Sequence, residues 1–224
     1  KLSGYISGAE LSARAVFDGK PMGEVCVRVT GRTASLMLTL AESHLWGPGN
    51  PNLYGLDLTL AQGGEAMDHV ESYFGLRDIT WDDNAMLLNG RPVFQRLILD
   101  QGFYPDGIYT APTDGDLKKD IELSQAMGFN GARLHQKMFE QRFLYWADKL
   151  GYIVWGEHAS WGLDITGPMG LERFLPEWME TMERDYSHPS IVGWCPFNET
   201  HSSQDDNVLA AVYAATKQID RTRP

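Results

Sequence analysis

The sequence predicts an α/β chain in two parts: an immunoglobulin-like β-sandwich domain over residues 1–80, then the first four β/α units of a (β/α)8 TIM-barrel over residues 81–224. Two patterns carry this prediction. The first third alternates apolar with polar residues between turn-forming pairs, which is typical of half-buried antiparallel strands. The remainder alternates apolar strands with helical spacing four times, which indicates a parallel sheet buried under helices.

The N-terminal strands are separated by turn residues such as Asp18-Gly19 and Gly63-Gly64. The run from Leu45 to Tyr54 is rich in Pro, Gly and Asn and predicts a loop between two strands. Residues 72–79 have the pattern of a closing strand. The other predicted strands cover residues 13–17, 23–29, 34–40 and 53–60.

After a hairpin-like turn at residues 89–92, the apolar spacing changes to that of alternating strands and helices. Glycines at positions 128 and 151 follow two of the helical patterns and predict their ends. The predicted strands cover 93–99, 132–135, 152–155 and 191–197, and the predicted helices cover 114–127, 139–150, 171–186 and 208–219.

The composition excludes several classes of protein. A net charge of −11 with no basic stripe argues against a nucleic-acid partner. Cys26 and Cys195 form neither a disulfide framework nor a metal-ligand spacing, and we expect no metal and no cofactor. No apolar run approaches the roughly 20 residues of a membrane span, so we expect a soluble protein without a membrane partner. A start at Lys1 without Met predicts a piece of a longer protein, which leaves a cytoplasmic or exported location open.

The segment from His188 to Thr200 contains the most informative pattern, an apolar strand that ends in Asn198-Glu199. A carboxylic acid at a strand terminus, beside an amide that can bind a sugar hydroxyl, is suited to protonating a glycosidic oxygen. The alternative is that the pair caps the following helix. The pattern alone favours neither interpretation.

Five ordered motifs together resemble glycoside hydrolase family 2, which contains β-galactosidases, β-glucuronidases and β-mannosidases. The resemblance implies retaining hydrolysis of terminal β-glycosides, with Glu199 as general acid/base and Asn198 on the sugar 2-hydroxyl. It favours a β-galactosidase-like activity on a carbohydrate substrate. The motifs are Leu45-Trp-x-Pro-x-Asn-Pro-Asn-Leu-Tyr54, Phe74-Gly-Leu-Arg77, Leu88-Asn-Gly-Arg-Pro92, Met127-Gly-Phe-Asn130 with Arg133, and His188-Pro-Ser-Ile191 leading to Asn198-Glu199.

The same resemblance places the nucleophile, a second glutamate, on a later barrel strand outside residues 1–224. We therefore expect the isolated chain to be inactive. We also expect the open sheet edges of half a barrel to favour self-association, including a homo-oligomer.

Several polar residues near predicted strand ends are candidates for substrate binding. Asp100-Gln101 stand where many family members have Asn-Arg-His-Glu, so the sugar specificity is open. Asp100 either binds the sugar or holds a barrel arginine such as Arg133. His135 either contacts substrate or is a structural histidine.

Glu157 ends the third predicted barrel strand, and we interpret it as a site-shaping carboxylate paired with Arg133. Aromatic rings stack on the C–H faces of sugars. Trp161 is the best exposed candidate for this role because it follows Glu157 in a loop. The other aromatic residues near these strand ends are Phe103, Tyr104, Trp155 and Trp194.

Two other classes of function remain open. A noncatalytic carbohydrate-binding or scaffold protein would have the same architecture. A lyase or isomerase built on a barrel would need a phosphate-binding glycine loop or a Schiff-base lysine at a strand end, and the sequence has neither. A glucuronidase would need a basic contact for the sugar carboxylate, and no such cluster is evident.

Overall fold

The computed structural model describes residues 2–4, 6–164, 166–200 and 203–224. The chain forms two compact units. The first comprises residues 1–45 and 52–76, and the second comprises residues 46–51 and 77–224. Over the described ranges, no helix has both the length and the apolar character needed to cross a membrane. The domain boundary between residues 80 and 81 stays a prediction.

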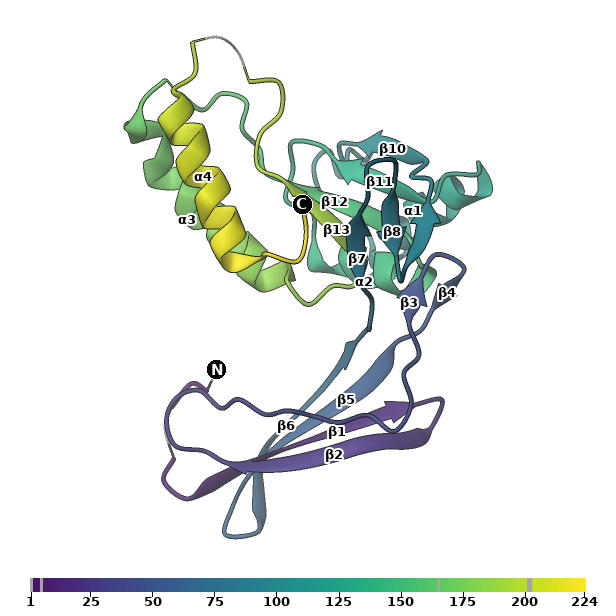
Figure 1. The fold of residues 1–224 in the computed structure, drawn as a ribbon, viewed down its shortest axis with the longest axis vertical. Helices are drawn as coiled ribbons and strands as arrows, with labels where there is room; N and C mark the ends of the chain where they lie inside the picture. The colour runs from purple at the N-terminus through teal and green to yellow at the C-terminus, as the bar shows by residue number, and fades with distance from the viewer. Residues whose placement is uncertain (1, 5, 165, 201–202) are drawn as a thin grey trace. The chain divides into compact units, whose positions relative to one another are not determined.

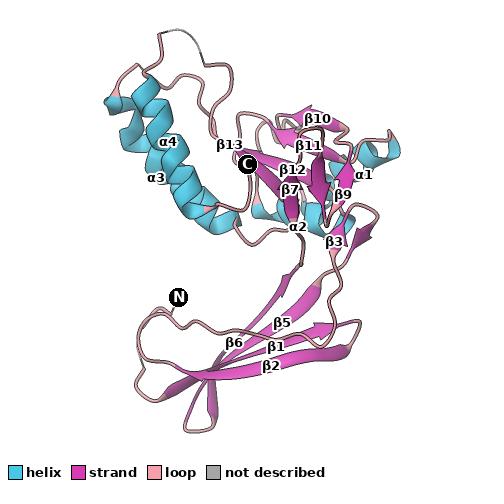
Figure 2. Ribbon diagram, viewed as in Figure 1, coloured by secondary structure: helices cyan, strands magenta, loops and turns pink. Residues whose placement is uncertain are grey.

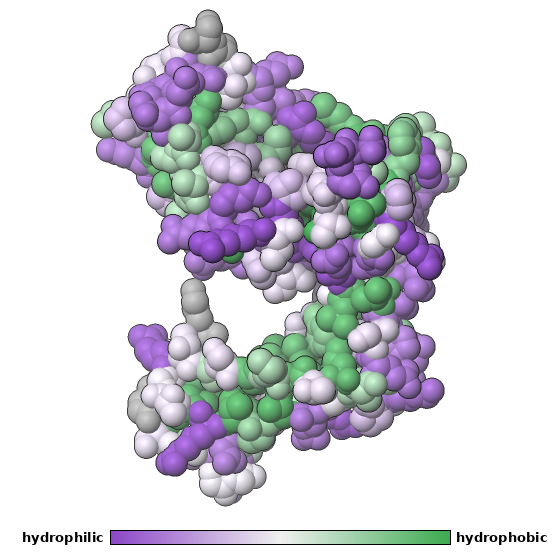
Figure 3. Space-filling model, in the orientation of Figure 1, coloured by the Kyte–Doolittle hydropathy of each residue, from purple (hydrophilic) through white to green (hydrophobic). Residues whose placement is uncertain are grey.

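The first unit is built on one antiparallel sheet with the strand order β2-β1-β5-β6 (Figure 1). Ala15, Met22 and Tyr54 are buried in its core. Leu11, Leu58 and Leu60 line a cavity of about 160 Å³ in this unit, and Figure 3 shows apolar surface over the same sheet. The strands are β1 (Ala9–Phe17), β2 (Lys20–Arg28), β5 (Tyr54–Gln62) and β6 (Glu65–Phe74).

The prediction of a strand over residues 34–40 is wrong, because this described segment is not paired as a strand. It nevertheless packs closely on the sheet: Leu38 and Leu40 contact the core, and a Cβ added to Gly23 would lie 2.2 Å from the Thr39 carbonyl oxygen. The alternation of apolar residues therefore reflects packing without strand pairing. The predicted strand over 72–79 is also divided, since β6 ends at Phe74 and β7 covers Ile79–Trp81.

Short strands precede the main sheet of the second unit. Asn89 and Gly90 form the turn between β8 and β9 with φ angles of 54° and 71°. This left-handed pair matches the two-residue hairpin turn predicted from Asn-Gly. These strands are β3 (Trp46–Gly47), β4 (Asn50–Pro51), β7, β8 (Met86–Leu88) and β9 (Arg91–Val93).

The main sheet has four parallel strands in sequence order, and helices connect successive strands (Figure 2). This confirms the four predicted β/α units of the barrel fold. The first strand begins later than predicted, at Leu97, and residues 94–96 belong to no strand. The elements are β10 (Leu97–Asp100), α1 (Asp114–Ala126), β11 (Gly131–Leu134), α2 (Gln141–Leu150), β12 (Ile153–Glu157), the 3-10 turn η1 (Pro168–Gly170), α3 (Leu171–Asp185), β13 (Ile191–Cys195) and α4 (Asp206–Ile219).

The two faces of this sheet have different roles. Ala132, Leu134 and Val154 belong to the hydrophobic core formed with helix residues such as Phe143 and Trp178. Side chains alternate between faces along a strand. Arg133 and Glu157 are therefore on the face opposite this core. The packing of the helices thus leaves one face of the sheet for polar side chains.

Buried polar contacts fix the start of β13. The carboxylate of Asp148 on α2 accepts hydrogen bonds from Ser190 N (2.9 Å) and His188 Nδ1 (2.6 Å). Arg77 donates to the carbonyl oxygens of Pro189 (2.9 Å) and Ile191 (2.8 Å). Burial, with the charge of Arg223, lowers the pKa of Arg77 to about 10. The guanidinium remains charged at neutral pH.

Asp220 forms a second buried group behind β13. Its carboxylate accepts hydrogen bonds from Trp194 Nε1 (2.8 Å), from Thr222 N (2.8 Å) and Oγ1 (2.7 Å), and from Arg223 Nη1. Burial alone would raise the pKa of Asp220, but the hydrogen bonds from Thr222, Trp194 and Arg223 outweigh it and hold the pKa well below its ordinary value. The folded state therefore favours the ionised form.

We predict that Asp220→Asn lowers the free energy of unfolding at pH 7 by about 2–3 kcal/mol. A depressed folded-state pKa contributes stability above the ordinary aspartate pKa of about 3.9 and loses it at lower pH. The difference between the two proteins should therefore shrink below about pH 4. Urea unfolding at pH 7, 5 and 3.5 measures it. Asp106→Asn, in an exposed loop, is the control and should change stability by less than about 0.5 kcal/mol. A pH-independent difference would contradict this assignment.

Candidate functional site

The predicted site residues lie at or just beyond the carboxyl ends of the four parallel strands. Asp100 ends β10, and Gln101 follows it. His135 follows the last residue of β11, and Glu157 ends β12. Asn198 and Glu199 follow β13 after a two-residue connection. In (β/α)8 barrels this edge of the sheet carries the active site.

Five residues at this edge form a closed ring of hydrogen bonds, which we call the strand-end ring. Glu157 Oε2 accepts from Arg133 Nε (2.6 Å), and its Oε1 accepts from the backbone N–H of Gln136 (2.9 Å). Gln136 Nε2 donates to Ser160 Oγ (3.0 Å), which also accepts from the backbone N–H of Asn198 (3.2 Å). Arg133 Nη2 closes the ring on Asn198 Oδ1 (2.6 Å). The ring joins the ends of β11, β12 and β13.

The charged pair in this ring is partly removed from solvent. The Glu157 side chain is fully buried, while that of Arg133 is 34% exposed. The hydrogen bond from Arg133 to Glu157 raises the pKa of the guanidinium, which opposes its loss of charge. Arg133 Nε and the Gln136 N–H thus satisfy the Glu157 carboxylate, which would be costly to bury alone. Glu157 is thus paired with Arg133, as the sequence predicts.

The ring also fixes the orientation of the Asn198 amide. Arg133 binds Oδ1, so Nδ2 is the group left over. Nδ2 is buried and has no hydrogen-bond partner among the described residues. An unpaired buried donor costs stability, typically about 1–3 kcal/mol. Among the described residues, this donor is thus left without an acceptor.

Glu199 follows this amide in an unusual backbone conformation. Its φ is 48°, in the left-handed region that non-glycine residues seldom adopt. Its side chain is exposed, unlike that of Asn198. Backbone strain of this kind is concentrated at functional sites. The turn places an accessible carboxylic acid directly beside a buried amide donor.

Asp100 and Gln101 have local partners. Asp100 Oδ1 accepts from Gly102 N (2.8 Å), and burial raises the pKa of this carboxyl. The Arg133 guanidinium is bound by Glu157 and Asn198, so Asp100 is not the carboxylate that holds it. Gln101 Nε2 lies 3.0 Å from His135 Nδ1. His135 is buried, and its backbone N–H donates to the Asp100 carbonyl oxygen (2.8 Å).

Trp161 is the most accessible of the predicted aromatic residues near Asn198. It is 62% exposed, and its Nε1 donates to the Asn198 carbonyl oxygen (3.3 Å). Its ring stands edge-on to His135 with centroids 6.0 Å apart. Tyr104 and Trp194, by contrast, are buried in the hydrophobic core and do not offer a ring to a sugar.

Sequence reasoning missed three residues of this region: Gln136, Lys137 and Ser160. Lys137 is buried, and its Nζ donates to the carbonyl oxygens of Gly102 (3.2 Å) and Tyr109 (2.8 Å). This lysine ties the segment after β10 to the segment after β11. The three residues lie just after strand ends, and this position could have marked them as candidates for the site. Polar residues are, however, common in such loops.

Possible metal ligands occur in the first unit. Asp57, His69 and Glu71 present ligand atoms within 4.8 Å of one another on β5 and β6. They are largely exposed, and exposed groups of this composition are common without an ion.

In the second unit, burial and the nearby charge of Glu157 raise the pKa of Cys195 to about 11. That thiol stays protonated at neutral pH and is a poor nucleophile or metal ligand.

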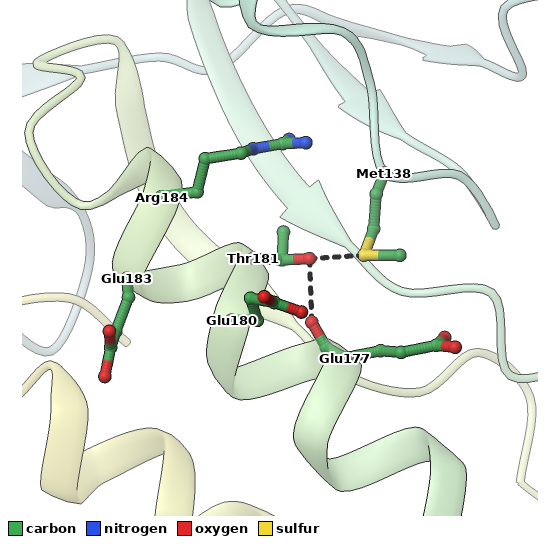
Figure 4. Close-up of a pocket in the computed structure, with 6 residues that line it drawn as sticks. All are labelled: Met138, Glu177, Glu180, Thr181, Glu183 and Arg184. Carbon is green, nitrogen blue, oxygen red and sulfur yellow. Dashed lines mark hydrogen bonds between the residues drawn. The ribbon is translucent and has the colours of Figure 1, made fainter.

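A separate pocket of about 590 Å³ lies along α3 (Figure 4). Thr181 Oγ1 contacts Met138 Sδ there and donates to the Glu177 carbonyl oxygen. The pocket shares no residue with the strand-end ring. Its lining residues are Met138, Glu177, Glu180, Thr181, Glu183 and Arg184.

Comparisons with known proteins agree with this architecture. Residues 13–77 match the model of glycosyl hydrolases family 2, and residues 82–224 match the model of the TIM barrel domain of the same family. A β-glucuronidase of Rattus norvegicus is 27% identical over 90% of this chain and 32% of its own length. A β-galactosidase of Photobacterium profundum is 28% identical over 84% of this chain and 18% of its own length.

A solved structure of a β-D-glucuronidase for Dictyoglomus thermophilum has the same fold. It has a TM-score of 0.86 and 23% identity, over 97% of this chain and 39% of that chain. The chain spans about a third or less of the length of the Rattus and Photobacterium relatives. Because the two family models together cover most of the sequence, the chain belongs to glycosyl hydrolases family 2.

Proposed function

We propose that this chain is part of a retaining β-glycosidase in which Glu199 is the general acid/base and Asn198 binds the sugar. The observation that carries the proposal is the Asn198-Glu199 pair itself. An exposed carboxyl follows a buried amide whose Nδ2 is unpaired among the described residues and whose Oδ1 is bound by Arg133. The pair lies beyond the end of β13, where barrel enzymes perform their chemistry.

In the proposed reaction, Glu199 donates a proton to the glycosidic oxygen as the bond to the anomeric carbon breaks. The same carboxylate then removes a proton from the water that releases the sugar. Asn198 Nδ2 donates to the oxygen of the sugar 2-hydroxyl, an interaction that strengthens in the transition state. Retention also needs a carboxylate nucleophile about 5–5.5 Å from the acid.

We assign that nucleophile to a part of the protein outside residues 1–224. Asp100 and Glu157 are poor substitutes because both are engaged in internal hydrogen bonds. Glu157 uses both oxygens, on Arg133 and on the Gln136 N–H, and it is fully buried. Asp100 bonds the Gly102 N–H.

We further propose a neutral β-galactoside as the substrate. A uronate would need a free cation near the sugar. The two cationic side chains closest in sequence to the end of β11 already have partners within the protein. Arg133 binds Glu157 and Asn198, and Lys137 binds two backbone carbonyl oxygens. A β-glucuronide is the second candidate, favoured by the similarity to the β-glucuronidases of Rattus norvegicus and Dictyoglomus thermophilum.

We predict that the full-length parent protein hydrolyses one of a panel of p-nitrophenyl β-glycosides, with the galactoside fastest. Glu199→Gln should lower kcat/KM by about 10²–10⁴-fold, because the proton donor is lost. The loss should be smaller for a 2,4-dinitrophenyl glycoside, whose leaving group needs less protonation. Glu172→Gln, in the first turn of α3, is the matched control and should retain activity.

Three outcomes would count against this proposal in different ways. Fastest hydrolysis of the glucuronide would replace the galactoside assignment. Equal losses for both leaving groups would argue against Glu199 as the acid. No hydrolysis of any glycoside, with measurable sugar binding, would favour a noncatalytic carbohydrate-binding protein.

We also predict that residues 1–224, purified alone, have no measurable hydrolysis of the same panel. The reason is that the proposed nucleophile is outside this segment, while its own strand-end carboxylates are engaged as described. The assay compares equal molar amounts of the segment and the full-length parent. Turnover by the segment that Glu199→Gln abolishes would place a working nucleophile within it and contradict the assignment.

A further inference from the structure

Gln136 connects two sides of the strand-end ring at once. Its backbone N–H donates to Glu157 Oε1, and its side-chain Nε2 donates to Ser160 Oγ. Its Oε1 accepts from the backbone N–H groups of Ser160 (2.9 Å) and Trp161 (3.0 Å). One residue after β11 thus organises the loop after β12.

The backbone of Gln136 is itself strained. Its φ is 56°, in the left-handed region. Such a conformation is unfavourable for a non-glycine residue and persists only where surrounding contacts hold it. Here the conformation allows the backbone N–H to reach Glu157 while the side chain reaches Ser160.

The contacts continue from this loop to Asn198. Ser160 Oγ accepts the Asn198 backbone N–H (3.2 Å), and Trp161 Nε1 donates to the Asn198 carbonyl oxygen (3.3 Å). Both main-chain polar groups of Asn198 are therefore bound by neighbours that Gln136 holds. Arg133 binds the side chain of the same residue.

We propose that Gln136 is a positioning residue for the proposed glycosidase reaction: through Ser160 and Trp161 it fixes the Asn198 main chain, so that Nδ2 meets the sugar in the transition state. The proposal rests on the proposed function of Asn198-Glu199. The contacts need a neutral amide, which accepts through one atom and donates through another. A glutamate at position 136 would place a second negative charge beside Glu157, and a methionine has the length without the hydrogen bonds.

The test compares Gln136→Met in the full-length parent and in its Asn198→Ala form. In the parent we expect kcat/KM to fall about 10–100-fold, mainly in kcat, because the lost interaction is made in the transition state. In the Asn198→Ala form the same substitution should cost less than about 3-fold, since its effect runs through the absent amide.

Gln125→Met is the matched control. The Gln125 side chain also donates a hydrogen bond through Nε2, to the Leu150 carbonyl oxygen (2.9 Å), but Gln125 lies on α1. This substitution should leave kcat/KM within about 2-fold of the parent. Thermal unfolding of each variant shows whether the protein is folded. If Gln136→Met does not fold, Ser160→Ala tests the same path and should show the same dependence on Asn198.

Equal fold-losses from Gln136→Met with and without Asn198 would overturn the proposal, as would an unchanged kcat in the folded variant. A loss confined to thermal stability would overturn it as well. Failure of the proposed function is distinguishable, because it would appear as the absence of glycoside hydrolysis in the unsubstituted parent.

Discussion

The buried charge of Glu157 is the constraint on which the arrangement of the site depends. A carboxylate with no exposed side-chain surface must receive hydrogen bonds and an opposite charge. Arg133 supplies the charge, and the Gln136 N–H supplies a second donor. Once these bonds are formed, the remaining donors of Arg133 and Gln136 point to partners beyond β12. The strand-end ring is the consequence of satisfying one buried anion.

This constraint converts a sheet edge into an oriented site. An asparagine amide has two ends that differ only in whether they donate or accept. Arg133 can only donate, so it selects the oxygen of Asn198 and leaves the nitrogen. The amide is therefore set before any ligand arrives, which lowers the cost of ordering it during binding. The left-handed φ of Glu199 is a separate cost at the same place.

The sequence was sufficient for the fold class and for one contact between strand ends, but not for the rest of the strand-end ring. Apolar residues at helical spacing predicted the helices, and near-continuous apolar runs predicted the strands between them. Such runs arise because a parallel sheet is buried on both faces. Residues 34–40 show the limit of that reasoning, since Leu38 and Leu40 alternate as in a strand yet only pack on a sheet. The pairing of Arg133 with Glu157 was predicted, because both residues follow from strand position. Gln136 was missed because its role depends on a positive φ, which no local pattern indicates.

The proposed preference for a neutral sugar rests on how the nearby cationic side chains are used. A cationic side chain can bind either an acceptor within the protein or a carboxylate of the substrate. Arg133 and Lys137 are used for the first purpose, on Glu157 and on the carbonyls of Gly102 and Tyr109. Redirecting either one to a uronate would leave a buried acceptor unpaired, at a typical cost of about 1–3 kcal/mol. Recognition of a neutral sugar by amides and aromatic rings avoids that cost. In the proposed site, the exposed ring of Trp161 beside Asn198 would provide such a surface.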